Sequence, residues 1–113
     1  NVSAVSGIMF GTGAIKSETS SANVNILGTS DKFIKIFNMK IEAGSYLTEE
    51  DEDSGRRVVV LGSEIKKSLF GNEQALGKLV KINDSEHRVI GTIIPTGDKM
   101  GFNVDEIAFI PTR

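Results

Sequence analysis

Residues 10–17, FGTGAIKS, contain the glycine, lysine and serine types with which proteins bind the phosphates of a nucleotide. In a nucleotide-binding loop of the type G-x-x-x-x-G-K-[ST], the lysine directly follows the last glycine. Here two residues separate Gly13 from Lys16, and a polar, strand-like segment follows instead of a helix whose free N–H groups could bind an anion. We therefore interpret Gly11 and Gly13 as positive-φ residues in a turn between two strands, and we predict no nucleotide binding.

The single histidine and the acidic run at residues 49–53 are the other groups that could do chemistry. His87 has no nucleophile motif or metal-ligand partners near it in sequence, so we interpret it as a solvated strand residue. A calcium loop that began at Asp51 would need glycine at the sixth position and glutamate at the twelfth. Gly55 is the fifth residue, and the twelfth is not glutamate. Adjacent loop acids also give no sign of the carboxylate separation that a glycosidase needs. The sequence thus predicts no catalytic group, metal site or cofactor.

Composition narrows the class of protein further. The 113 residues suffice for one domain, and a net charge of −2 disfavours nucleic acid as a partner. The absence of cysteine excludes thiol nucleophiles, disulfides and cysteine-based zinc sites. The apolar runs are too short to cross a bilayer, and the chain begins without methionine inside a strand-like segment. We therefore expect residues 1–113 to be a single domain fragment of a longer protein.

Hydrophobic patterning in the first half predicts strands over residues 2–10, 22–27 and 40–44. Between the last two, Ser30 or Asp31 caps a short helix that extends to Phe37. The acidic segment that follows is predicted to be a loop with one helical turn, capped by Thr48.

The second half predicts a buried strand over residues 57–61, because its β-branched run is unbroken. A helix over residues 64–70 follows, with Ser63 as its N-cap and Gly71 as its C-cap. Ile65 and Leu69 face the core, and Phe70 in the same turn is a further candidate for this face. Further strands are predicted over residues 78–82, with Leu79 outside, over 86–94 and over 106–110. The fold class is α+β, a strand-dominated mixed sheet with two short helices.

Residues 95–106, PTGDKMGFNVDE, are too long for a tight hairpin turn and contain two large apolar side chains, Met100 and Phe102. One interpretation is that Phe102 folds back onto the core. The other is that Met100 and Phe102 contact a neighbouring subunit, an adaptor protein or another lobe of the same protein.

Residues 58–93 carry a series of short motifs in a fixed order: Val-Leu-Gly, Leu-Phe-Gly, Leu-Gly-Lys and Val-Ile-Gly. With the upstream segment around Gly44 and the closing AFIPTR, this order resembles the periplasmic core domain of MacB-like ABC transporter permeases, which are related to the FtsX-like permeases. The family has a glycine–arginine pair where this chain has Gly44 and Ser45. The residues that carry the match are Gly44, Gly62, Leu69, Phe70, Gly71, Gly77 and Gly91, and we assign them to the fold and not to a reaction.

The resemblance implies the β-rich lobe of an extracytoplasmic domain in a membrane permease, with this lobe on the periplasmic side of the cell (inner) membrane. Its implied role is in export or mechanotransmission driven by ATP hydrolysis elsewhere in the complex. The implied partners are the other lobe and the transmembrane helices of the permease, an ATP-binding subunit or domain, an adaptor protein and a second copy in a homodimer. The alternative is a small ligand-binding or interaction module that is not attached to a transporter.

Overall fold

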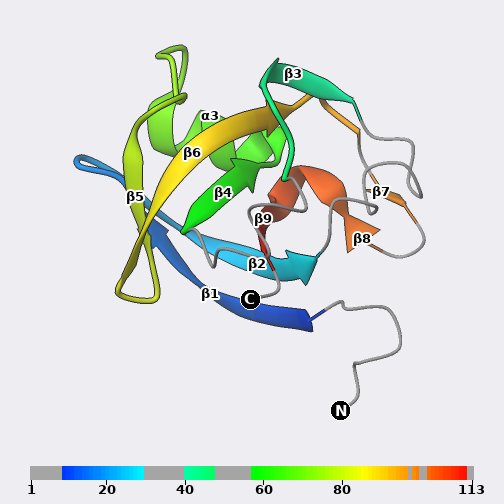
Figure 1. Cartoon of the computed structure of the whole chain (residues 1–113), viewed down its shortest axis with the longest axis horizontal. Coiled ribbons are helices and arrows are strands. Elements are labelled where there is room, and N and C mark those ends of the chain that lie inside the picture. Colours follow the sequence, from blue (N-terminus) through cyan, green and yellow to red (C-terminus); the bar gives the residue numbers. More distant parts are fainter. Residues whose placement is uncertain (1–8, 30–39, 48–56, 97, 100–101, 112–113) are drawn as a thin grey trace.

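The computed structural model describes residues 9–29, 40–47, 57–96, 98–99 and 102–111 (Figure 1). Along the chain the elements are β1 (Met9–Lys16), β2 (Ser21–Thr29), β3 (Ile41–Gly44), β4 (Val58–Leu61), α3 (Ser63–Phe70), β5 (Leu79–Ile82), β6 (Ser85–Ile93), β7 (Asp98–Lys99), β8 (Phe102–Asn103), the 3₁₀ turn η2 (Val104–Glu106) and β9 (Ile107–Pro111).

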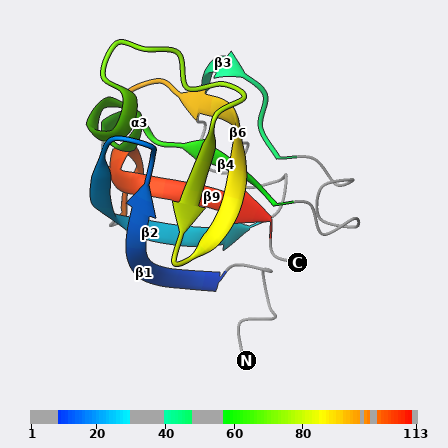
Figure 2. The same ribbon diagram turned by 90° about the vertical axis from the view of Figure 1, so that its left-hand side faces the viewer.

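Six strands form a closed ring of hydrogen-bonded neighbours in the order β6, β4, β9, β2, β1 and β5, because β5 also pairs with β6. The pairs β2–β9 and β4–β6 are parallel and the other pairs of the ring are antiparallel, so the sheet is mixed. Figures 1 and 2 show this small barrel from two sides, with β3 added to the far end of β6. The α+β, strand-dominated mixed sheet predicted from the sequence is confirmed.

Two hydrophobic clusters lie on opposite faces of the strands, and β4 contributes to both. Val59 and Leu61 belong to the interior cluster, whereas Val58 and Val60 belong to the outer cluster. All four residues are buried, as an unbroken β-branched run predicts for a strand with both faces covered. Helix α3 packs Ile65 and Leu69 into the interior cluster, with Phe70 partly buried against it. The outer cluster gathers residues of β2, β4, β6, β9, η2 and the segment after β3.

The predicted strands that correspond to β2, β3, β4, β5, β6 and β9 and the helix α3 are confirmed, and three details are corrected. The first strand was predicted over residues 2–10; residues 2–8 lie outside the described residues, and β1 continues to Lys16. Gly11 and Gly13 lie inside β1, opposite Ile26 and Val24, and neither has positive φ. The turn falls later because Ser17 closes it, donating its N–H to the Ser20 carbonyl (2.8 Å) and accepting the Ser20 N–H at Oγ (3.1 Å).

The helix start and the loop before β9 are the other two corrections. Ser63 is the first residue of α3 and is buried, while Gly62 stands at the cap position without a side-chain bond. Gly62 is held there by its N–H bond to the Ile107 carbonyl (2.9 Å), so the chain enters α3 directly from β4. The predicted loop at residues 95–106 contains the short strands β7 and β8 and the turn η2. The predicted helix before Phe37 and the helical turn after Thr48 lie outside the described residues.

A close crossing of two glycines joins β3 to β6. Gly44 pairs with Gly91 in register and has φ 78°. A Cβ on Gly91 would overlap the carbonyl oxygen of Ser45 and lie 2.9 Å from its carbonyl carbon. The segment after β3 therefore crosses directly over β6, where the Ser45 N–H bonds to the Ile90 carbonyl (3.0 Å). This crossing brings Tyr46 and Leu47 into the outer cluster.

Candidate functional site

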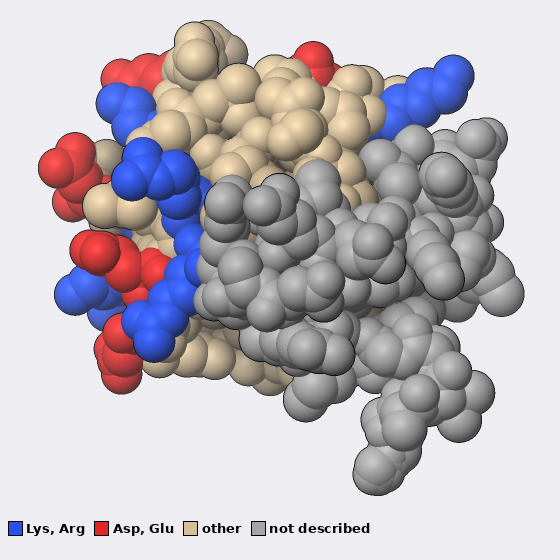
Figure 3. Space-filling model, in the orientation of Figure 1, with Lys and Arg blue, Asp and Glu red and all other residues tan. Residues whose placement is uncertain are grey.

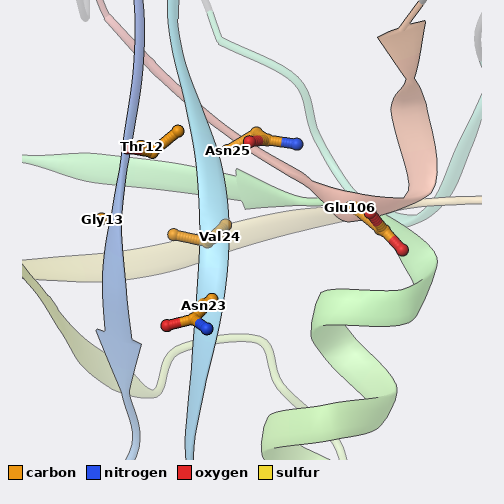
Figure 4. A pocket seen from close by; sticks show the side chains of 6 residues that line it. All are labelled: Thr12, Gly13, Asn23, Val24, Asn25 and Glu106. Carbon is orange, nitrogen blue, oxygen red and sulfur yellow. The ribbon is translucent and has the colours of Figure 1, made fainter.

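An open depression of about 420 Å³ lies where β1 and β2 meet the end of η2 (Figure 4). Thr12 of β1 is directly opposite Asn25 of β2, and Asn23 lies two residues away on the same face of that strand. Glu106 of η2 completes the polar lining. Between the two asparagines, Val24 points the other way into the interior cluster.

The depression offers three neutral hydrogen-bonding side chains and one carboxylate. Amide and hydroxyl groups both donate and accept, so this lining suits polar contacts with a ligand or a protein surface. Thr12 and Glu106 are the residues of nucleophile and base type in this lining, and they come from separate elements, β1 and η2. Over the described parts of the chain, no cluster of His, Cys, Asp and Glu can hold a metal ion. Sequence reasoning did not identify this depression, although the alternation Asn23–Val24–Asn25 places both amides on one face.

His87 is not solvated, which corrects the interpretation made from sequence. It lies in β6 opposite Val80 and is only 9% exposed. Its Nδ1 is 3.1 Å from the Ser85 carbonyl oxygen. Burial is the main cause that lowers the pKa of His87 below its ordinary value. The Ser85 carbonyl opposes this in part, and the charge of Arg57 lowers the pKa by a smaller amount. The neutral imidazole is thus a component of the barrel wall.

The two predicted contact residues are only partly described. Met100 lies outside the described residues, and only the backbone of Phe102, in β8, is described. Around them, the Thr96 N–H donates to Asp105 Oδ1 (2.7 Å), and the Asp105 N–H donates to Asn103 Oδ1 (3.2 Å). These bonds fix both ends of the segment. The contact of Met100 and Phe102 with a partner stays a prediction.

The family-motif residues lie at junctions between elements and not in the depression. Gly62 contacts η2 closely, since a Cβ there would be 2.6 Å from the Asp105 carbonyl oxygen. Gly71 and Gly77 have positive φ at the end of α3 and before β5. Leu69 is buried in the interior cluster and Phe70 packs against it. Together with Gly44 and Gly91, these residues position strands and turns.

Charged side chains do not gather into a patch of one sign on the described part of the face in Figure 3. Lysine and arginine side chains alternate there with aspartate and glutamate. Such a mixed surface gives no electrostatic footprint for a polyanion. Among the described residues, no helix has the length and apolar character needed to cross a membrane.

Comparison with known proteins identifies the family. The model of the MacB-like periplasmic core domain matches residues 1–113. The macrolide export ATP-binding/permease protein MacB of Wolinella succinogenes is 34% identical over 90 residues, which are 79% of this chain and 14% of that protein. The pyoverdine export ATP-binding/permease protein PvdT of Pseudomonas aeruginosa is 35% identical over 74 residues, 66% of this chain and 11% of that protein. The chain therefore spans only a small part of the curated relatives it matches.

Solved structures show the same fold. The periplasmic region of MacB from Actinobacillus actinomycetemcomitans matches with a TM-score of 0.80 and 28% identity, over 93% of this chain and 46% of that one. The extracellular domain of the ABC-type transporter YknZ from Gram-positive bacteria matches with a TM-score of 0.78 over 93% of this chain and 52% of that one, at 19% identity. The resemblance inferred from the ordered glycine motifs is thereby confirmed, and the chain belongs to the family of MacB-like periplasmic core domains.

Proposed function

We propose that this chain works as part of the extracytoplasmic region of an ABC export permease. The observation that carries the proposal is the family match over residues 1–113, together with the barrel shared with the periplasmic region of MacB. In this role the domain hydrolyses nothing itself. It changes position or conformation as ATP is hydrolysed in the cytoplasm by a nucleotide-binding domain or subunit.

The described residues support a mechanical role over a catalytic one. The motif glycines and His87 have structural roles. The glycines form close crossings, and the buried His87 belongs to the barrel wall. The relatives' names include exporters of a macrolide and of pyoverdine, so membership of the family does not fix the cargo. We include in the proposal the other lobe and transmembrane helices of the same permease, a homodimeric assembly and an adaptor protein at the exposed surface.

A topology experiment tests where the domain lies. The chain has no cysteine, so Glu18→Cys in the exposed β1–β2 turn gives one accessible thiol in a full-length protein whose other cysteines have been replaced. We expect a membrane-impermeant maleimide to label it in intact spheroplasts. Val59→Cys, at a position with no exposed surface, is the matched control and should react only after unfolding. Labelling of Glu18→Cys only after lysis would place the domain in the cytoplasm and refute the proposal.

The polar depression favours the second candidate, a small ligand-binding module. Its lining of Asn23, Asn25, Thr12 and Glu106 suits a polar molecule. The two candidates differ in what Asn23→Ala/Asn25→Ala changes in the full-length protein. A module that works through this depression loses its ligand response, whereas a domain that only transmits motion keeps its coupling between ATP hydrolysis and export.

A further inference from the structure

The barrel closes on itself at a short junction between β1 and β5. Only two residue pairs join these strands, Ile15–Ile82 and Lys16–Lys81, whereas β1 pairs with β2 along its whole length. Beyond them, Asn83 donates its N–H to the Ala14 carbonyl (3.1 Å) and accepts the Ala14 N–H at Oδ1 (3.1 Å). We call these two pairs and the Asn83–Ala14 bonds the β1–β5 seam.

Side-chain packing stabilises the β1–β5 seam on its buried face only. Ile15 and Ile82 are buried in the interior cluster, but Lys16 and Lys81 are exposed and directly opposite one another. Like charges opposite each other in an antiparallel pair are destabilising. Glu86, opposite Lys81 on its other side, offsets part of this repulsion but belongs to the β5–β6 hairpin.

The other short junction of the ring differs in burial. The pair β4–β9 also has two residue pairs, Val60–Phe109 and Leu61–Ala108, but all four side chains are fully buried. Opening that junction would expose both clusters to water. Opening the β1–β5 seam exposes part of the interior cluster and breaks the pairing at Ile15–Ile82 and Lys16–Lys81 together with the two Asn83–Ala14 hydrogen bonds, of which the side-chain bond is exposed.

Asn83 depends on the turn and on Gly13 for its position. Asn83 and Asp84 form the two-residue turn between β5 and β6 with φ of 48° and 76°. The Asn83 side chain then lies over Gly13, where a Cβ would be 2.7 Å from its Cγ. The missing side chain at Gly13 is what admits the amide to the edge of β1.

From this geometry we propose that the β1–β5 seam is a built-in opening point, at which the β1–β2 hairpin separates from the β5–β6 hairpin while the other junctions stay paired. Asn83 acts as the closing contact. Local openings of lower free energy than global unfolding are expected where few buried contacts hold an element. The inference goes beyond the proposed transport role and does not depend on it, because the opening is a property of the barrel itself.

Thiol reactivity tests the opening in the full-length protein after any other cysteines are replaced. Ile15→Cys places a thiol at the seam, and Val59→Cys places the matched thiol in the same interior cluster on β4. We expect the thiol at position 15 to react at least about tenfold faster with a small disulfide reagent, because it is exposed by local opening. Ile82→Cys, on the other strand of the seam, serves if Ile15→Cys does not fold. Equal rates that follow global unfolding would overturn the proposal.

Substitutions at Asn83 and Lys16 test whether the opening occurs at the β1–β5 seam. Asn83→Gly removes the amide but keeps a residue suited to positive φ, and Asp84→Gly is its matched control in the same turn. In the Ile15→Cys background we expect Asn83→Gly to speed labelling by about tenfold, from the loss of a hydrogen bond, and Asp84→Gly to change it much less. Lys16→Glu, which replaces the like-charge pair by an opposite one, should slow labelling. Equal effects of the two glycine variants would also count against the role of Asn83.

Discussion

The crossing of Gly44 and Gly91 makes the sharpest stability prediction, because a single methyl group has no space there. In Gly91→Ala the new Cβ would overlap the Ser45 carbonyl oxygen and approach its carbonyl carbon to 2.9 Å and its nitrogen to 3.2 Å. The obstacle is backbone and not the end of a flexible side chain. Relief therefore requires the segment after β3 to move away from β6.

The free-energy cost of that movement can be estimated from the overpacking and from the hydrogen bond that is weakened. Overpacking costs about 1–3 kcal/mol, and the Ser45–Ile90 hydrogen bond that must lengthen contributes about 1 kcal/mol. Tyr46 and Leu47 would also be drawn from the outer cluster. We expect Gly91→Ala to lower the free energy of unfolding by about 2–4 kcal/mol, and Tm by roughly 8–16 °C for a domain of this size.

Gly11→Ala is the matched control, since it is also a strand glycine but has no atom within 4 Å of the position of a Cβ. We expect its free energy of unfolding to stay within about 0.5 kcal/mol of the parent chain. Urea and thermal unfolding followed by circular dichroism measure both variants. If Gly91→Ala unfolds at the same urea concentration as Gly11→Ala, the close crossing does not exist as described and the reasoning fails.

Three other predictions follow from single features. The pKa of His87 is lowered in the fold from an ordinary value of 6.5, so the unfolded chain binds more protons than the folded chain below that pH. We therefore expect the contribution of His87 to the free energy of unfolding to be constant above about pH 6.5 and to fall as the pH drops below it. His87→Gln should remove this slope, as measured by urea titrations at several pH values. Met100→Ser/Phe102→Ser in the full-length transporter should reduce transport with an unchanged Tm if these side chains contact a partner, while a lowered Tm alone would assign Phe102 to the core. The isolated chain should show no saturable heat of ATP binding in calorimetry, because residues 10–17 lie mostly within strand β1 and lack the loop-to-helix geometry of a phosphate site.

The sequence was sufficient for those parts of the fold in which local pattern decides the structure. The unbroken run of β4, the exposed Leu79 in β5 and the inward Ile65 and Leu69 of α3 follow from side-chain type and period alone. The family was also accessible, because its glycines occur in a fixed order along the chain. Burial of His87 was missed although the alternation of β6 indicates it. Glu86 and Arg88 lie on the exposed face, so His87 between them shares the buried face with Val89.

Gly11 and Gly13 show why the remaining contacts could not be predicted from the sequence alone. From sequence, Gly11 and Gly13 look alike, and positive φ in a turn explains both equally well. In the barrel they are both extended strand residues, but Gly11 faces open space whereas Gly13 receives the amide of Asn83 from a residue seventy positions later. Nothing local to either segment specifies that meeting, because it exists only once β1 and β5 close the ring. Another long-range pairing, that of β2 with β9, brings Glu106 of η2 to the polar depression beside β1 and β2. The contact of Asn83 with Gly13 and the lining of the depression are therefore products of strand pairing and not of a local sequence motif.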